Sequence, residues 1–209
     1  MRMSSIYIRN VTKTFGDKVV FKNLTMEISE EQITCIMGPS GTGKTTLLRM
    51  LMGVEQADSG TIEGVFGHKL SVVFQEERLC EQLNAIDNIR LVNPIYTKQE
   101  VKQELARLGL SDSDQQPVSK LSGGMRRRVS ILRALLAEYE VLFLDEPFQG
   151  LDNALKEQVI DYLKESVYKK TVIVVTHDIQ EAKKLGDNFI YMCKDLHDTQ
   201  TISKVKEGV

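Results

Sequence analysis

The fold is decided by one stretch of this sequence, Gly38-Pro39-Ser40-Gly41-Thr42-Gly43-Lys44-Thr45-Thr46. It matches the phosphate-binding pattern G-x-x-x-x-G-K-[ST] at every fixed position. The apolar run at residues 33–37 predicts a buried strand before it, and residues 45–52 predict a helix after it. A strand, a glycine loop and a helix N-terminus together aim several backbone N–H groups at one anion. The stretch therefore predicts a binding site for nucleotide phosphates.

The chemistry of this loop follows from its residue types. Glycines let the backbone approach phosphate oxygens without a side chain in between. We expect Lys44 to reach the β- and γ-phosphates of ATP and to take part in catalysis, and the Thr45 hydroxyl to ligate Mg²⁺. All residues from 38 to 46 are candidate ATP-binding residues. The alternative is a chance glycine turn, which the full pattern in a strand–helix context disfavours.

Length and composition are those of a globular protein. The chain has 209 residues, 42% of them hydrophobic and 27% charged, which suits one domain with a sizeable core. A net charge of −2 argues against a general nucleic-acid binder, so no nucleic-acid partner is expected. The longest apolar runs, such as residues 172–175, are strand-sized and far shorter than the roughly 20 residues that span a bilayer.

The cellular location is inferred from the N-terminus and the cysteines. Residues 1–5 lack the apolar stretch of a secretory signal. Cys35, Cys80 and Cys193 form an odd, scattered set without metal-ligand spacing, which favours reduced thiols in a cytoplasm. We expect a cytoplasmic protein that reaches a membrane only through a partner.

Strand and helix patterns alternate along the chain. Turns are expected at residues 14–17 and 57–60, and helices around residues 101–108, from 125 to about 137, and after a cap at Asp152. This alternation indicates an α/β fold, a mainly parallel sheet with helices on both faces and a small N-terminal β layer. Apolar runs predict strands at residues 6–12, 19–28, 61–65, 70–74, 141–144, 171–175 and 189–192, the last of which closes the sheet.

The sequence pattern changes between residues 76 and 119, where little of it is strand-like. Val101, Leu105 and Leu108 recur at helical spacing, and Gly109 stands where a helix would end. We interpret residues 76–125 as a helical subdomain inserted into a single domain spanning 1–209. Residues 1–75 and 126–209 then form the β layer and the α/β core.

Two carboxylates follow the apolar run at residues 141–144. Asp145 and Glu146 are expected at the carboxyl end of a parallel strand, where such folds bind ligands. Asp145 would hold Mg²⁺, directly or through a water, and Glu146 would polarise the water that attacks the γ-phosphorus. The alternative is an ordinary acidic turn at a strand end.

Further residues stand in an order that resembles a known family. Leu121-Ser122-Gly123-Gly124, before a helix and upstream of the acidic strand end, is similar to the signature motif of ABC-type ATPases. Gln75 resembles that family's glutamine loop, His177 its switch histidine, Phe15 its adenine-stacking aromatic, and residues 150–152 its loop after the acidic strand. The resemblance implies a P-loop NTPase fold with a RecA-like core, an N-terminal antiparallel β layer and an inserted α-helical subdomain.

The resemblance also implies a homodimer. Ser122 and the N–H groups of Gly123 and Gly124 form a second anion site at a helix start, which suits the γ-phosphate of another subunit. In the family, two ATP molecules lie between two chains arranged head to tail. We therefore expect Leu121, Ser122, Gly123, Gly124 and Asp152 to bind ATP in trans. Taken alone, the signature stretch fits a helix-capping turn, and Asp152 fits a helix cap.

Three single residues receive roles from the same resemblance. Gln75 offers an amide oxygen to Mg²⁺ or to the attacking water, as a catalytic residue and a metal ligand. His177 hydrogen-bonds the γ-phosphate as a second catalytic residue, and Phe15 stacks on adenine. The alternatives are a polar strand end, a structural or merely exposed histidine, and a core aromatic. His68 and His197 lack such a context and receive no role.

The run Arg126-Arg127-Arg128 points in different directions on a helix, so it does not form one basic face. We expect salt bridges and an ATP-facing contribution from it rather than nucleic-acid binding. Met125 stands where the family signature has glutamine. This change removes a polar side chain near the partner's nucleotide and should leave hydrolysis intact.

Residues 75–89 are similar to the corresponding segment in ATPases of the nitrate/sulfonate/taurine-type importers. Leu79, Leu83, Asp87 and Asn88 have counterparts there, whereas Glu81-Gln82 replaces Pro-Trp. The resemblance implies the ATP-hydrolysing subunit of a membrane ABC transporter, a solute importer, peripheral on the inner face of the cell membrane. Its implied partners are permease subunits, bound through the helical subdomain, and a solute-binding protein reached through the complex.

Three other functions remain open at this point. One is the ATPase of a lipoprotein- or peptide-exporting ABC system, and another is a soluble ABC ATPase without a transport role. The third is a P-loop kinase of a small molecule, which would not need Ser122, Gly123 and Gly124.

Overall fold

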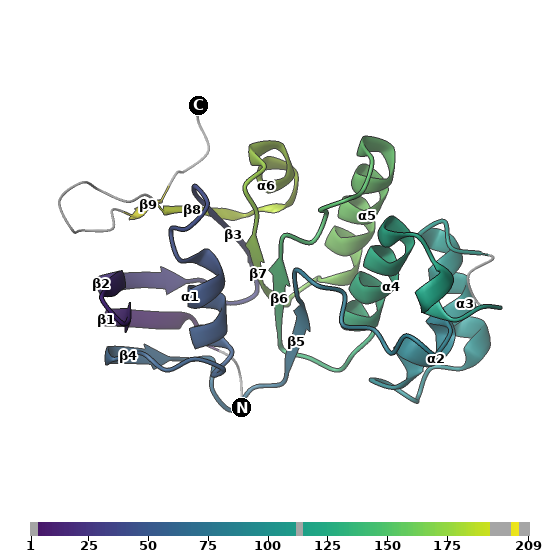
Figure 1. The fold of residues 1–209 in the computed structure, drawn as a ribbon, viewed down its shortest axis with the longest axis horizontal. Helices are drawn as coiled ribbons and strands as arrows, with labels where there is room; N and C mark the ends of the chain where they lie inside the picture. Colours follow the sequence, from purple (N-terminus) through teal and green to yellow (C-terminus); the bar gives the residue numbers. More distant parts are fainter. Residues whose placement is uncertain (1–3, 112–114, 193–201, 205–209) are drawn as a thin grey trace.

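The fold is built around a mainly parallel sheet. The computed structural model describes residues 4–111, 115–192 and 202–204. Within them, six strands form one sheet in the order β5-β6-β7-β3-β8-β9 (Figure 1). They are β3 (Ile33–Met37), β5 (Leu70–Val73), β6 (Val141–Asp145), β7 (Thr171–Val175), β8 (Asn188–Met192) and β9 (Ile202–Lys204).

The strands from β5 to β8 in this order run parallel, and β9 pairs antiparallel with β8. The prediction that residues 189–192 close the sheet is therefore wrong, because Ile190 lies opposite Lys204 and Met192 opposite Ile202. A three-residue strand is too short to show a period in the sequence. The parallel strands place their carboxyl ends at one edge, which is where such folds bind ligands.

Side chains of the central strands alternate between two apolar layers. Leu142 and Val174 belong to the layer formed with α4 (Gly123–Leu135), α5 (Asn153–Ser166) and α6 (Ile179–Leu185). Phe143 and Ile173 belong to the layer formed with α1 (Lys44–Leu51) and the N-terminal sheet. Because both faces are covered, β6 and β7 are buried throughout, which explains their continuous apolar runs.

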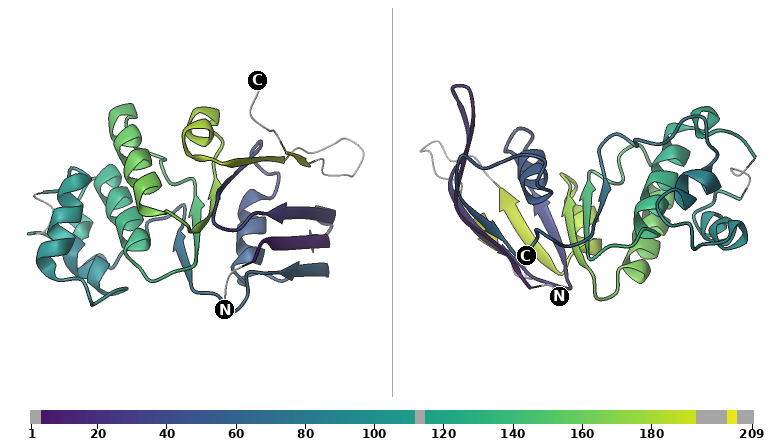
Figure 2. Two further views of the ribbon diagram at one scale, coloured as in Figure 1. Left: turned by 180° about the vertical axis from the view of Figure 1, so that it is seen from behind. Right: turned by 90° about the horizontal axis from the view of Figure 1, so that it is seen from below.

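The N-terminal sheet is antiparallel, with the order β2-β1-β4 (Figure 2). Its strands are β1 (Ile6–Phe15), β2 (Lys18–Ile28) and β4 (Ser59–Glu63). The predicted turns are too long, since β1 includes Thr14 and Phe15 and β4 starts at Ser59. Asp58 accepts hydrogen bonds from the backbone N–H of Thr14 at 2.7 Å and from its hydroxyl at 2.6 Å. This contact ties the end of β1 to the start of β4.

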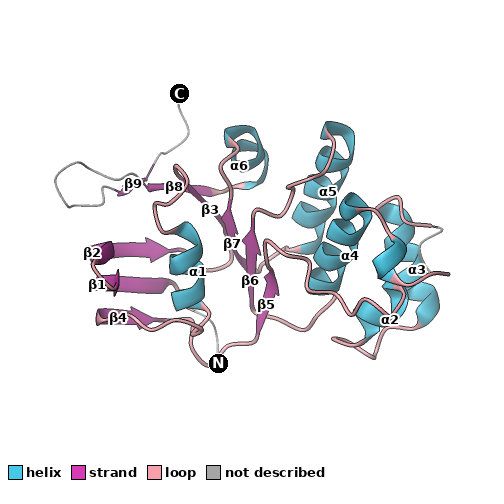
Figure 3. Cartoon of the chain, viewed as in Figure 1, coloured by secondary structure: helices cyan, strands magenta, loops and turns pink. Residues whose placement is uncertain are grey.

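Helices gather at the end of the molecule opposite the antiparallel sheet (Figure 3). There α2 (Ala85–Arg90), α3 (Lys98–Arg107) and a 3₁₀ turn (Val118–Lys120) accompany α4. The residues predicted to share one helical face, Val101, Leu105 and Leu108, are all fully buried. The division into 1–75, 76–125 and 126–209 stays a prediction, and its second boundary falls inside the continuous helix α4.

None of the described helices is long and apolar enough to cross a membrane. Cys35 is buried, and burial raises the pKa of its thiol to about 12, whereas Cys80 is exposed. Cys193 and His197 lie outside the described residues.

Ile173 and Ile95 form a matched pair that tests the packing of the core. Ile173 on β7 is 0% exposed and Ile95 is 87% exposed. Ile173→Ala leaves a cavity between the sheet and α1, so we expect the free energy of unfolding to fall by about 2–5 kcal/mol. Ile95→Ala should change it by less than about 0.5 kcal/mol. Denaturant titrations followed by circular dichroism measure both, and equal effects would contradict the packing described here.

Candidate nucleotide-binding site

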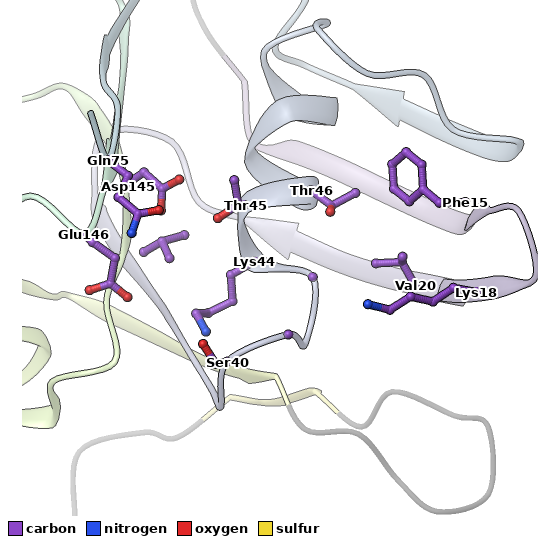
Figure 4. A pocket seen from close by; sticks show the side chains of 13 residues that line it. Phe15, Lys18, Val20, Ser40, Lys44, Thr45, Thr46, Gln75, Asp145 and Glu146 are labelled. Carbon is purple, nitrogen blue, oxygen red and sulfur yellow. The ribbon is translucent and has the colours of Figure 1, made fainter. Parts of the chain in front are cut away.

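The glycine loop joins β3 to α1 at the carboxyl edge of the parallel sheet (Figure 4). Helix α1 begins at Lys44, and its N-cap residue Gly43 has a φ of 95° and no side chain to cap it. The first N–H groups of α1 are therefore left for an anion. The strand and the helix predicted around the loop are both confirmed, the helix to within one residue.

Two glycines of the loop occupy positions that no other residue fits. Gly38 has a φ of 145°, and a Cβ there would lie 2.1 Å from the carbonyl oxygen of Met192. A Cβ at Gly43 would lie 2.7 Å from side-chain atoms of Phe21 and Val20. The loop thus lies against β8 on one side and β2 on the other, too closely for a side chain.

Lys44 is held within the curve of the loop. Its Nζ donates to the carbonyl oxygen of Gly38 at 2.7 Å and to that of Pro39 at 2.9 Å. Burial lowers the pKa of Lys44, and the nearby carboxylates of Glu146 and Asp145 oppose this change. The ammonium group therefore already lies inside the loop that the sequence predicts to bind phosphate.

Asp145 ends β6 at the same edge of the sheet and is buried. Burial raises the pKa of its carboxyl, and a hydrogen bond with the Thr45 side chain opposes the rise. The Gln75 side chain lies beside Asp145 in Figure 4. A hydroxyl, a carboxylate and an amide oxygen are hard donors of the kind that Mg²⁺ accepts. In the described part of the chain, no cluster of three or more His, Cys, Asp or Glu side chains could hold a metal.

Glu146 follows Asp145 with a backbone φ of 47°, in the left-handed region. Its carboxylate oxygen lies 2.8 Å from Nδ1 of His177, the residue that follows Thr176 after β7. The hydrogen bond to Glu146 and the charge of that carboxylate raise the pKa of His177. The structure therefore brings these two predicted residues into direct contact, with His177 on the exposed side.

Lys44, Asp145 and Glu146 line one cavity of about 380 Å³, whereas His177 does not line it. In Figure 4, Asp145 and Glu146 lie near Lys44 on one side and Phe15 lies on the other. The Phe15 ring is half-exposed, and the ammonium of Lys13 lies 4.8 Å from the ring centre. The predicted residues that line the cavity are Phe15, Ser40, Gly41, Gly43, Lys44, Thr45, Thr46, Gln75, Asp145 and Glu146.

Three residues that line the cavity were not predicted, namely Lys18, Val20 and Val175. Lys18 lies opposite Phe15 in the pairing of β1 with β2. The tight turn between these two residues is the signal that indicates this pairing in the sequence. Val175 lines the cavity because β7 lies beside β6, which the sequence pattern does not reveal.

The residues predicted to act in trans lie elsewhere in the chain. Ser122 caps α4 by accepting from the N–H of Met125 at 3.2 Å. Asp152 caps α5 by accepting from the N–H of Leu155 at 3.0 Å. Neither these two residues nor Leu121, Gly123 and Gly124 line the cavity. Their part in binding requires a second chain and stays a prediction.

The three consecutive arginines do not behave as predicted. Arg127 and Arg128 are buried, and the hydrogen bonds of both guanidinium groups go to backbone carbonyl oxygens instead of carboxylates. Arg126 likewise donates to the carbonyl of Leu121 at 3.2 Å. Among the described residues, none of the three arginines forms the predicted salt bridges, because α4 is buried against strand and helix ends that present carbonyl groups. None of the three lines the cavity of its own chain, and the predicted contribution towards ATP stays a prediction.

The contact between Glu146 and His177 predicts a shifted titration. Because the pKa of His177 is raised above its ordinary 6.5, the attraction is present at low pH and is lost as the pH rises through the raised pKa. Glu146→Gln should move the pKa of His177 back towards 6.5, which an NMR titration of the imidazole protons measures. Glu140→Gln, which removes the carboxylate beside His68, is the control and should leave His177 unchanged. If the pKa of His177 were the same in the Glu146→Gln variant as in wild type, the contact between the two side chains would be contradicted.

Sequence comparison supplies a family. The model of the ABC transporter family matches residues 21–149. An aliphatic sulfonates import ATP-binding protein of Rhodococcus jostii is 36% identical over 192 residues, which cover 90% of this chain and 71% of that protein. A bicarbonate transport ATP-binding protein of Synechocystis is 35% identical, covering 91% and 74%. A spermidine/putrescine import ATP-binding protein of Acetivibrio thermocellus is 35% identical, covering 90% of this chain but 58% of that protein.

Structural comparison supports the same fold. The structure of a bacterial Atm1-family ABC exporter with ATP bound superimposes with a TM-score of 0.79 at 22% identity. The superposition covers 91% of this chain and 37% of the exporter. The predicted α/β fold class, with its parallel core, antiparallel N-terminal sheet and additional helices, is thus confirmed. The chain belongs to the ABC transporter family, as one of its ATP-binding ATPase domains.

Proposed function

We propose that the chain is the ATP-hydrolysing subunit of a membrane ABC transporter that imports a solute. The observation that carries this proposal is the single cavity in which Lys44, Thr45, Asp145 and Glu146 meet. Import is supported by the relatives named for the import of sulfonates and of spermidine and putrescine. Lipoprotein or peptide export is the alternative, but the likeness to an exporter concerns the fold alone.

ATP binding exchanges the partners of Lys44. Charged phosphate oxygens are stronger acceptors than the carbonyls of Gly38 and Pro39 that hold its ammonium without nucleotide. The uncapped N–H groups at the start of α1 donate to the same phosphates. At the other end of the cavity, the half-exposed Phe15 ring stacks on adenine.

The carboxylate end of the cavity performs the chemistry. Thr45, Gln75 and Asp145, which line the cavity together, would hold Mg²⁺, and the ion would neutralise charge on the phosphates. Glu146 orients the attacking water and takes its proton as the water oxygen bonds to the γ-phosphorus. The bond from that phosphorus to the bridging oxygen breaks, which releases ADP and phosphate. His177, beside Glu146, hydrogen-bonds the γ-phosphate.

The site is completed by a second copy of the chain. Ser122 and the N–H groups of Gly123 and Gly124 stand at the exposed start of α4, outside the cavity of their own chain. In a head-to-tail homodimer they contact the γ-phosphate bound by the partner. Asp152 belongs to the same contact surface, and Leu121, which is 4% exposed, lies buried directly before Ser122.

A groove beside the cavity suits the permease. It has a volume of about 600 Å³ and shares Thr45, Gln75 and Asp145 with the nucleotide cavity. A partner bound in the groove would therefore contact residues that also face the phosphates. Val54, 62% exposed, and Arg78, stacked 3.8 Å from the Phe74 ring centre, belong to its rim. The permease would hold the chain at the inner membrane face and link it to a solute-binding protein.

Substitutions of Glu146 and Lys44 separate hydrolysis from binding. Glu146→Gln should bind ATP normally, hydrolyse it at least about 100-fold more slowly and accumulate as dimers. Lys44→Ala should weaken ATP binding. Lys69 is an exposed lysine paired with Glu138, and the Lys69→Ala control should behave like wild type. Calorimetry measures ATP binding, phosphate release measures hydrolysis, and size-exclusion chromatography with ATP measures dimer formation. If the Glu146→Gln variant hydrolysed ATP at a rate within a few-fold of wild type, Glu146 would not be the general base.

A charge in the groove tests the docking of the permease. Val54→Glu should lower the amount of permease that co-purifies with a tagged chain by at least about tenfold, since it replaces an exposed apolar side chain of the groove by a charged one. Tyr168→Glu is the control, because Tyr168 is 77% exposed but precedes β7 at the opposite edge of the sheet. Equal recovery of the permease with both variants would exclude the groove as the docking site.

A further inference from the structure

Arg127 uses every donor of its side chain within the protein. A guanidinium group has five N–H bonds in a rigid, planar fork. Nε donates to the carbonyl of Pro147 at 2.8 Å. Nη1 donates to Phe74 at 2.5 Å and Gln75 at 3.1 Å, and Nη2 donates to Asp145 at 3.0 Å and Glu146 at 2.5 Å. All five acceptors are backbone carbonyl oxygens.

These acceptors belong to two segments that the chain does not connect locally. Phe74 and Gln75 follow β5, whereas residues 145–147 end β6 and continue beyond it. Arg127 reaches both from α4 and is only 2% exposed. One rigid group therefore spans the ends of two neighbouring strands, at the edge that carries the nucleotide cavity.

The geometry at Glu146 shows what this group stabilises. Glu146 has a φ of 47°, a conformation that residues other than glycine seldom adopt. Three consecutive carbonyls, those of Asp145, Glu146 and Pro147, converge on Arg127. Parallel carbonyl dipoles repel one another, and a buried cation offsets that repulsion. The cation therefore favours the backbone conformation that directs the Glu146 carboxylate into the cavity.

We propose that Arg127 is a positioning residue that sets the placement of Gln75 relative to Glu146. This inference rests on the proposed hydrolytic function, in which Gln75 holds the metal and Glu146 takes the proton. Arg127 does not line the cavity, so it acts only through these two residues. Gln75 and Glu146 must both be correctly placed for in-line attack of the water on the γ-phosphorus. The backbone carbonyls of both residues accept hydrogen bonds from the same guanidinium group of Arg127.

The neighbouring Arg128 supplies a matched control. It is also buried, at 6% exposure, and it also donates to carbonyl oxygens. Its acceptors are Leu108, Gly109 and Gly124, none of which lines the cavity of its own chain, so Arg128 can affect hydrolysis only through Gly124 and the partner's ATP. The two arginines therefore share burial and bonding type but differ in the segments that they hold.

The first test compares Arg127→Met, Arg127→Lys and Arg128→Met. Methionine keeps an unbranched chain without donors, and lysine keeps the charge but cannot span five acceptors. We expect both Arg127 variants to lower kcat about 10- to 100-fold while the Kd for ATP changes less than about threefold. Arg128→Met should lower the Tm by a similar amount with a smaller loss of kcat. Should Arg127→Met fail to fold, Arg127→Lys carries the test, and a folded lysine variant with wild-type kcat would overturn the proposal.

A double-mutant cycle with Glu146→Gln separates positioning from general stabilisation. If part of the effect of Arg127 passes through Glu146, then Arg127→Lys should lower the single-turnover rate by a clearly smaller factor in the Glu146→Gln background than in the wild-type background, and the remaining loss passes through Gln75. Arg128→Met should lower the rate by the same factor in both backgrounds. An equal, multiplicative loss for Arg127→Lys in both backgrounds would also overturn the proposal. If the wild-type protein did not hydrolyse ATP, the proposed function itself would be refuted. That outcome is distinguishable from one in which the wild type is active and only the role of Arg127 is contradicted.

Discussion

β3 and β6 lie on either side of β7, and both run parallel to it. In this pairing Ile36 and Asp145 are each level with Val175, so the glycine loop and the acidic strand end leave the sheet at the same height. Parallel neighbours require crossover connections over the faces of the sheet, which here include helices, and these leave the carboxyl edge open. The loop lysine and the carboxylates, far apart in the sequence, meet because of this alignment alone.

The site concentrates buried polar groups before any ligand arrives. Lys44 is held by loop carbonyls, Asp145 by Thr45, and Arg127 by carbonyls at two strand ends. A buried charge without partners is costly, so each of these groups constrains its neighbours. ATP would replace the partners of Lys44 while those of Arg127 stay in place. Under the proposed function, the contacts of Lys44 are exchanged when ATP binds, whereas those of Arg127, behind the carboxylate proposed to be catalytic, are kept.

The predictions that failed share a cause. The salt bridges expected for Arg126, Arg127 and Arg128 assumed a solvated helix, but α4 packs against the sheet and the helical region, where the acceptors are carbonyls. Strand β9 was missed because three residues carry no period. The ends of β1 and β4 were misplaced because Asp58 bonds to Thr14, a contact that depends on the pairing of β1 with β4. Each failure concerns a contact or a short strand that the local pattern of residue types does not reveal.

The sequence by itself determined the strand–loop–helix unit, the alternation of strands and helices, and the residue types of the nucleotide site. These follow from local rules, namely glycine at positive φ, apolar periodicity and the placement of polar groups at strand ends. Only the tertiary structure decided which strand ends meet, that Glu146 contacts His177, and that Arg127 joins Gln75 to Glu146. Those pairings depend on strand order and on helix packing. Every residue has a backbone carbonyl, and a parallel neighbour is not adjacent in the chain, so no local pattern of residue types indicates either partner.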